Sequence, residues 1–114
     1  MKKFILILIV IGCSHNKNSI KIVEKEEFQY LINQDVQLID VRTPNEFFNG
    51  TIGKARNINF NSPVFKEQVL KLDINKPVVV FCHAGGRSAK ASLTLDSLGF
   101  KQIYDLKGGY SSWK

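Results

Sequence analysis

The chain has 114 residues, 44% of them hydrophobic, and a formal net charge of +6, which indicates one globular domain with a single core. Lys2 and Lys3 supply two of the positive charges, and the other lysines and arginines do not alternate with aromatic residues. The composition therefore argues against nucleic-acid binding, whereas the mild positive potential would favour small anionic ligands.

The first residues have the pattern of a secretory signal. Lys2 and Lys3 precede an apolar run at residues 4–11, which is far shorter than the ~20 residues needed to span a bilayer. Gly12 and Cys13 end this run and resemble the lipobox of bacterial lipoproteins, whose signal is cut before a cysteine that is then lipid-modified. The alternative to a lipoprotein signal is that these residues form a buried N-terminal strand or an uncleaved leader.

This pattern divides the chain into three parts: a lipoprotein-type signal peptide at residues 1–12, a lipidated Cys13 with a polar tether at residues 13–21, and one domain at residues 22–114. The lipid would anchor the domain to a membrane of the bacterial cell envelope. We therefore expect the domain to face the periplasm or the exterior.

The rest of the chain alternates between short apolar segments and segments of helical periodicity, which indicates an α/β domain. Strands are predicted at residues 20–23, 37–41, 78–81 and 102–106, and helices at residues 26–33, 45–49, 63–72 and 88–98. This order predicts a mostly parallel central sheet with helices on both faces. In such sheets ligands bind at the carboxyl ends of the strands, where Arg42, Cys82 and Lys107 would lie.

Cys82 follows a strand of apolar, mostly β-branched residues and enters a loop that contains Gly85 and Gly86. The next helix is predicted to begin with Ser88 as its N-cap and to end at Gly99. Backbone N–H groups at a helix N-terminus favour an anion, so this loop is a candidate site for a thiolate, a persulfide or a bound oxyanion. The competing interpretation is a buried, inert cysteine in an ordinary strand-to-helix turn.

Four segments resemble those of the single-domain rhodanese-like sulfurtransferases, and they follow one another along the chain in the family's order. Residues 82–88 resemble the family's C-x-x-G-x-R-S loop, and residues 38–47, 50–58 and 106–113 resemble L-I-D-V-R-x-x-x-E-F, G-H-I-x-x-A-x-N-I and L-x-G-G-x-x-x-W. The resemblance implies a rhodanese-like α/β fold in which Cys82 carries sulfur as a persulfide and Arg87 is a second catalytic residue. It also implies that the substrate-binding loop consists of His83, Ala84, Gly85, Gly86 and Ser88. We expect neither a cofactor nor a metal ion.

The chain departs from the family pattern at Thr51, where a His is frequent, and at Gly53 and Lys54, which replace a usual Pro-Gly. Related phosphatases have five residues between the loop cysteine and arginine, whereas here four residues separate Cys82 from Arg87. The shorter loop argues against a phosphatase or an arsenate reductase.

Asp40 and Arg42 are expected to support the site. A carboxylate inside an apolar strand needs partners, so Asp40 is expected to accept hydrogen bonds from backbone groups or to pair with an arginine. Arg42 either contacts a substrate anion near the cysteine loop or braces the following turn by pairing with Glu46. His83 is expected to point to solvent, and a role as general base is the less favoured alternative.

A lipidated Cys13 would leave Cys82 as the only thiol, without a second cysteine to resolve a persulfide. We therefore expect a sulfurtransferase that takes sulfur from a small anionic donor, such as thiosulfate, or from a persulfide, and passes it to cyanide, a thiol or a protein. A persulfide or redox relay is a variant of this function. A non-catalytic rhodanese-like module that binds a partner is the alternative.

Overall fold

The structure is a computed structural model that describes residues 19–114. The predicted signal peptide, Cys13 and most of the predicted tether lie outside the described residues. Among residues 19–114, no helix is both long and apolar enough to cross a membrane.

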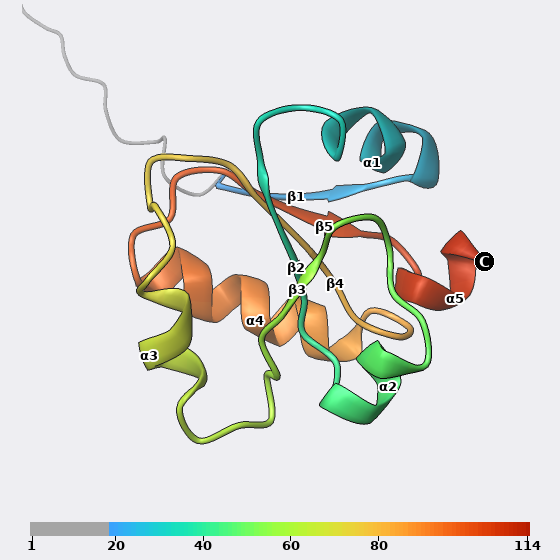
Figure 1. The fold of residues 1–114 in the computed structure, drawn as a ribbon. Coiled ribbons are helices and arrows are strands. Elements are labelled where there is room, and N and C mark those ends of the chain that lie inside the picture. Colours follow the sequence, from blue (N-terminus) through green and yellow to red (C-terminus); the bar gives the residue numbers. More distant parts are fainter. Residues whose placement is uncertain (1–18) are drawn as a thin grey trace, which may run out of the picture.

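Five parallel strands form one sheet in the order β1-β5-β4-β2-β3 (Figure 1). The strands are β1 (Ile20–Val23), β2 (Gln37–Asp40), β3 (Arg56–Asn57), β4 (Val78–Phe81) and β5 (Ile103–Leu106). The predicted α/β architecture with a parallel sheet is confirmed. β4 lies at the centre of the sheet and all four of its side chains are buried, as expected for a strand covered on both faces.

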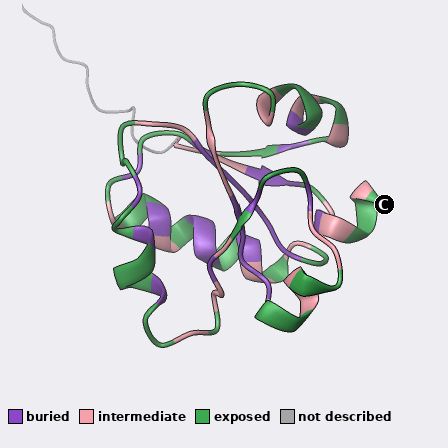
Figure 2. Ribbon diagram, viewed as in Figure 1, coloured by how far each residue is buried: buried purple, intermediate pink, exposed green. Residues whose placement is uncertain are grey.

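Helices cover both faces of the sheet, with two separate hydrophobic clusters beneath them (Figures 1 and 2). Because strand side chains alternate, Val78 and Val80 pack against α3 (Phe65–Val69) and α4 (Gly86–Ser97). Val79 and Phe81 point to the opposite face, where they pack with Phe28 of α1 (Lys25–Leu31) and with the region of α5 (Gly109–Trp113). The remaining helix, α2 (Pro44–Phe48), follows β2.

Some predicted element boundaries are wrong. The helix predicted at residues 63–72 is only Phe65–Val69, because turns occupy both flanks. The helix after the cysteine begins at Gly86, and its N-cap is Gly85 with φ +113°, not Ser88. Ser88 is instead buried in the first turn of α4. The two-residue strand β3 and the helix α5 were not predicted, because segments this short carry little periodicity.

Candidate active site

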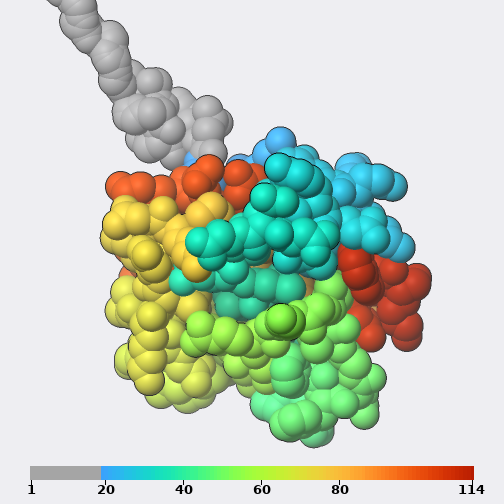
Figure 3. All heavy atoms as spheres, turned by 45° about the horizontal axis from the view of Figure 1, so that its top comes forward, coloured from blue at the N-terminus to red at the C-terminus, as the bar shows by residue number. Residues whose placement is uncertain are grey.

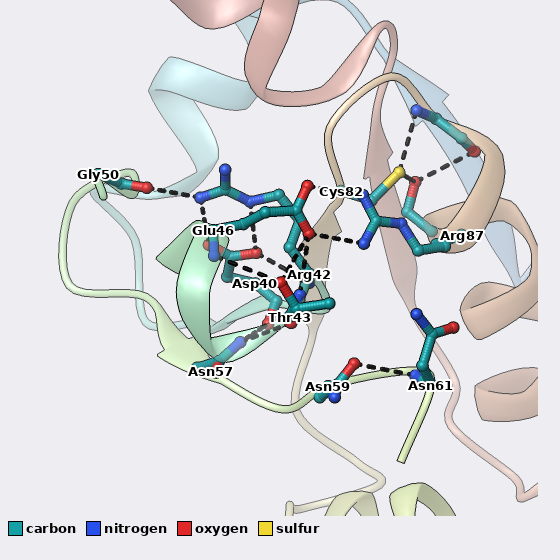
Figure 4. A network of polar contacts seen from close by, with 12 residues as sticks. Asp40, Arg42, Thr43, Glu46, Gly50, Asn57, Asn59, Asn61, Cys82 and Arg87 are labelled. Carbon is teal, nitrogen blue, oxygen red and sulfur yellow. Dashed lines mark hydrogen bonds and ion pairs between the residues drawn. The ribbon is translucent and has the colours of Figure 1, made fainter. Parts of the chain in front are cut away.

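Cys82 directly follows β4 and lies beneath the loop that leads into α4 (Figure 4). Its side chain is 1% exposed, and its Sγ accepts a hydrogen bond from the Gly85 N–H at 3.0 Å. The Cys82 thiol donates to the Ser88 Oγ at 3.4 Å, and that hydroxyl donates to the Gly85 carbonyl at 3.3 Å. Directly after its N–H, the positive φ of Gly85 turns the chain into α4, a conformation that a side chain would strain. The Gly85 N–H thus provides a backbone donor for a negative charge on Sγ.

The other residues of the cysteine loop form an open rim. His83, Ala84 and Gly86 are exposed, and Gly85 is half-buried. A Cβ added at Gly85 or Gly86 would meet no heavy atom within 4 Å, so open space lies next to both glycines. A small molecule can therefore approach this part of the loop without displacing a side chain.

The start of α5 also contacts the beginning of the cysteine loop and hydrogen-bonds to its backbone. The backbone N–H groups of Tyr110 and Ser111 donate to the carbonyls of Cys82 (2.7 Å) and His83 (2.9 Å). Gly109 lies so close that a Cβ there would collide with both carbonyls. These contacts give a physical reason for Gly109, the second glycine of the L-x-G-G segment. In the space-filling view, the red C-terminal residues lie against the light-blue α1 (Figure 3).

Asp40, the last residue of β2, and Arg42, two residues later, form a buried ion pair. Arg42 donates to the Asp40 carboxylate from Nε at 2.9 Å, from Nη2 at 2.8 Å and from its backbone N–H at 3.0 Å. Its Nη2 also donates to the Gly50 carbonyl, and its guanidinium lies 4.3 Å from the centre of the Tyr110 ring. Hydrogen bonding to Asp40 raises the pKa of Arg42 further above its usual value. At 3% exposure Arg42 supports the chain beside the site. Pairing with Glu46, one of the two roles considered for Arg42, is not what the structure shows, because the partner of Arg42 is Asp40.

Glu46 pairs instead with Arg87, which links α2 to the first turn of α4. Arg87 donates from Nη1 at 2.7 Å and from Nη2 at 3.0 Å to the two carboxylate oxygens of Glu46. Glu46 is positioned by a capping box with Thr43. The Arg87 guanidinium, followed by the contacts to Thr43, lowers the pKa of Glu46 to about 2. Figure 4 shows that the two arginines point in different directions, Arg42 toward Gly50 and Arg87 toward Glu46.

Asp105, which the sequence analysis did not single out, is buried on β5. Its side chain is 4% exposed, and its Oδ1 has no hydrogen-bond partner. Burial raises the pKa of Asp105 to about 6, although hydrogen bonding with Ser88 acts in the opposite direction. An acid between apolar residues of a predicted strand was the signal in the sequence that could have identified it.

Comparison with known proteins identifies the family. A sequence model of the Rhodanese-like domain matches residues 24–114. This chain belongs to the rhodanese-like domain family. It is 36% identical over 108 residues to the uncharacterized protein YqhL of Bacillus subtilis, covering 95% of this chain and 83% of that protein. It is 30% identical over 95 residues to the thiosulfate sulfurtransferase GlpE of Stutzerimonas stutzeri, covering 82% and 84%.

Solved structures agree with this assignment. A rhodanese-related protein of Thermoplasma volcanium superposes with a TM-score of 0.71 at 32% identity, covering 80% of this chain and 87% of that one. The human single-domain sulfurtransferase TSTD1 superposes with a TM-score of 0.67 at 28% identity, covering 80% and 92%. The rhodanese-like fold is therefore confirmed, and the relatives support a sulfurtransferase family.

In this rhodanese-like chain, Thr51 stands at the position where the family pattern has a frequent His. Its Oγ1 donates to Asp40 Oδ2 at 2.8 Å. On β3, Asn57 donates from its side chain to the carbonyls of Asp40 (3.0 Å) and Arg42 (2.9 Å). Within residues 19–114 there is no group of three His, Cys, Asp or Glu side chains that could hold a metal ion.

Proposed function

We propose that this protein is a sulfurtransferase that carries sulfane sulfur as a persulfide on Cys82. The observation that carries the proposal is the position of Cys82 Sγ, which accepts the Gly85 N–H in a glycine-containing loop at the start of α4. The name thiosulfate sulfurtransferase, printed for the GlpE relatives, supports this kind of reaction.

The reaction begins with attack of the Cys82 thiolate on the outer sulfur of the donor. With thiosulfate, a bond forms between Sγ and the outer sulfur, the sulfur–sulfur bond of thiosulfate breaks, and its electron pair leaves with sulfite. An acceptor nucleophile such as cyanide, a thiol or a protein thiolate then attacks the outer sulfur of the persulfide. The bond to Sγ breaks, and its electron pair returns to Cys82 as the thiolate.

The loop stabilises the charges that this reaction moves. The Gly85 N–H donates to Sγ, so it stabilises the thiolate before attack and again when the acceptor removes the sulfur. The Ser88 hydroxyl accepts from the thiol, and once the thiol is ionised it can turn its proton from the Gly85 carbonyl to the sulfur. Arg87, which the family resemblance led us to expect as a second catalytic residue, donates both Nη groups to Glu46. We therefore assign it the role of holding α2 against the start of α4 instead. The open space beside Gly85 and Gly86 is the proposed approach path for the donor.

The test is the rate of sulfur transfer from thiosulfate to cyanide by the full chain and by its Cys82→Ser variant. The Cys13→Ser variant is the matched control, because it removes the chain's other cysteine. We expect turnover and a one-sulfur mass gain after thiosulfate exposure in the wild type and in Cys13→Ser, and neither in Cys82→Ser. Absence of both from the folded wild type, with persulfide donors as well, would contradict the proposal and favour a non-catalytic binding module.

We also propose that Cys13 is lipid-modified and anchors the domain in the bacterial cell envelope, facing the periplasm or the exterior. The basic Lys2 and Lys3, the apolar residues 4–11 and the Gly12-Cys13 pair support this localisation. In bacteria fed a labelled fatty acid, the wild type should carry the label and sediment with membranes, and Cys13→Ser should do neither. Equal labelling of both proteins would contradict the proposal.

A further inference from the structure

A groove lies at the amino ends of β2 and β3, at the opposite end of the sheet from the cysteine loop. It has a volume of about 670 Å³ and lies between the segment that leads into β2 and the segment that leads into β3. Three cations line it, Lys54, Arg56 and Lys76, and among residues 19–114 no carboxylate does. The proposed sulfur transfer uses none of these residues, so we call this feature the basic groove and ask what it binds.

The positive charge of the basic groove is only partly neutralised. Lys54 and Arg56 are exposed, and within the part of the chain that the structure describes neither has an ion-pair partner. Lys76 pairs with the exposed Asp35 at 2.7 Å. At the carboxyl ends of the strands, by contrast, three cations have carboxylate partners: Arg42, Arg87 and Lys107. An anionic surface would therefore meet uncompensated positive charge at the groove.

The groove belongs to a larger positively charged face, which consists of the first residues of the strands and the loops that precede them. We call it the amino-end face. Of the described residues, those before β2, β3, β4 and β5 and at the start of β3 include two carboxylates, Asp35 and Asp73. The cations in the same segments are Lys54, Arg56, Lys71, Lys76 and Lys101. The amino-end face thus has a net positive charge.

Ser19, the first described residue, lies at this same end of the sheet. Its carbonyl accepts from the Ile103 N–H at the start of β5, and its Oγ donates to Asp96 near the end of α4. Because all five strands are parallel, the starts of β1, β2 and β3 lie at one end and the loop after β4 lies at the other (Figure 1). β1 and β3 are four strand spacings apart, which is roughly 19 Å.

The short chain between the proposed lipid anchor and the domain limits which face can meet the membrane. Cys13 is six positions before Ser19, and a chain of this length spans about 20 Å at most. The four residues of a strand place the Cys82 loop a further ~13 Å beyond the amino-end face. An anchor at Cys13 therefore brings the amino-end face to the lipid headgroups before the cysteine loop.

We propose that the amino-end face docks on an anionic phospholipid surface, with the basic groove against the headgroups. This inference rests on the proposed anchor at Cys13 and adds the side of the domain that faces the membrane. Phosphate groups of the lipids would lie beside Lys54, Arg56 and Lys76, and each cation near such a surface strengthens the contact about fivefold. The loop of Cys82 then faces away from the membrane and is open to soluble donors and acceptors.

The test measures which lysines a membrane protects from brief acetylation, read residue by residue by mass spectrometry. The full chain carrying Cys82→Ser is coupled through Cys13, its remaining thiol, to a maleimide lipid in vesicles. This coupling supplies the anchor whether or not cells acylate Cys13, so its result is independent of the fatty-acid labelling experiment. One set of vesicles is phosphatidylcholine, and the other is an equal mixture of phosphatidylcholine and phosphatidylglycerol. The tether is the same in both, and only the charge of the surface differs.

We expect Lys54 and Lys76 to be acetylated about fivefold more slowly on anionic than on neutral vesicles. Lys90 and Lys107, which lie toward the cysteine loop, should react at the same rate on both. Equal rates at Lys54 and Lys76 on the two kinds of vesicle would overturn the proposal. Protection of Lys90 and Lys107 in their place would also overturn it, because the domain would then face the membrane with its other end.

A soluble anion is the other source of phosphate for the basic groove. Inorganic phosphate is therefore added to the uncoupled chain without vesicles. It should leave the acetylation of Lys54 and Lys76 unchanged. Protection as large as that on anionic vesicles would assign the groove to a soluble anion and overturn docking on a membrane.

A pair of charge variants separates the groove from general attraction to a negative surface. Lys54→Gln with Arg56→Gln removes two cations of the groove, and Lys66→Gln with Lys90→Gln removes two exposed cations from α3 and α4. Both variants lose the same charge. The first should abolish most of the protection of Lys76 on anionic vesicles, and the second should retain it. Equal protection of Lys76 in the two variants would overturn the role of the groove.

Discussion

Asp40 and Asp105 are both buried carboxyl groups at the carboxyl ends of strands that flank β4, but their surroundings are opposite. Asp40 accepts hydrogen bonds from three N–H groups of Arg42 and from the Thr51 hydroxyl. Asp105 has one oxygen without any partner, and its pKa is raised to about 6. Donors, not burial alone, therefore decide the role of a buried carboxyl. Asp40 holds the chain through its bonds to Arg42 and Thr51, whereas the unpartnered Asp105 has a raised pKa.

Asp40→Asn should give the largest effect, because it replaces a carboxylate with an amide and leaves the buried Arg42 without its counter-charge. We expect the free energy of unfolding to fall by about 3 to 5 kcal/mol, as for other broken buried pairs. Urea unfolding followed by circular dichroism measures this change. Asp35→Asn is the control, because Asp35 is an exposed partner of Lys76 and its loss should produce no measurable change. Equal stability of Asp40→Asn and the wild type would contradict the structural role of the pair.

Asp105→Asn should change how stability depends on pH. The native pKa of about 6 lies above the ordinary value of 3.8 for this side chain, so the native state binds the proton more tightly than the unfolded chain. Below the lower value both states are protonated and the group contributes nothing. As the pH rises from about 4 to about 6, the wild type should lose about 3 kcal/mol of stability relative to Asp105→Asn. Urea unfolding of both proteins at several pH values measures the difference, and a constant difference would show that Asp105 has an ordinary pKa.

Thr51→Val should give the smallest of the three effects, since Asp40 keeps its three donors from Arg42. Loss of one hydrogen bond to a charged group should cost about 1 to 2 kcal/mol. Thr51→Ser retains the hydroxyl and is expected to remain close to the wild type in thermal and urea unfolding. A loss in Thr51→Ser as large as in Thr51→Val would assign the effect to packing of the methyl group.

Patterns of neighbouring residues were sufficient to predict much of the fold and part of the site. The four buried residues of β4, followed by Cys82 and two glycines, predicted the position of the sulfur because strand, turn and helix signals there are local. The partner of Arg87 was not predicted, because Glu46 is 41 residues away in the sequence and the contact depends on how α2 packs. Glu46 was considered as a possible partner of Arg42 because the two residues are close in the sequence. In the structure Arg42 pairs with Asp40, and Glu46 pairs with Arg87.

Local patterns were enough to predict the parallel α/β architecture, the family, the placement of Cys82 at the carboxyl end of the central strand and the need of Asp40 for a partner such as an arginine. These features depend on side-chain periodicity, on short motifs and on neighbours such as Arg42, two residues from Asp40. Only the packed structure shows that Asp105 has an oxygen without a partner and that α5 supports the Cys82 carbonyl. These two features depend on burial and on groups brought together from distant parts of the chain, so no local pattern encodes them.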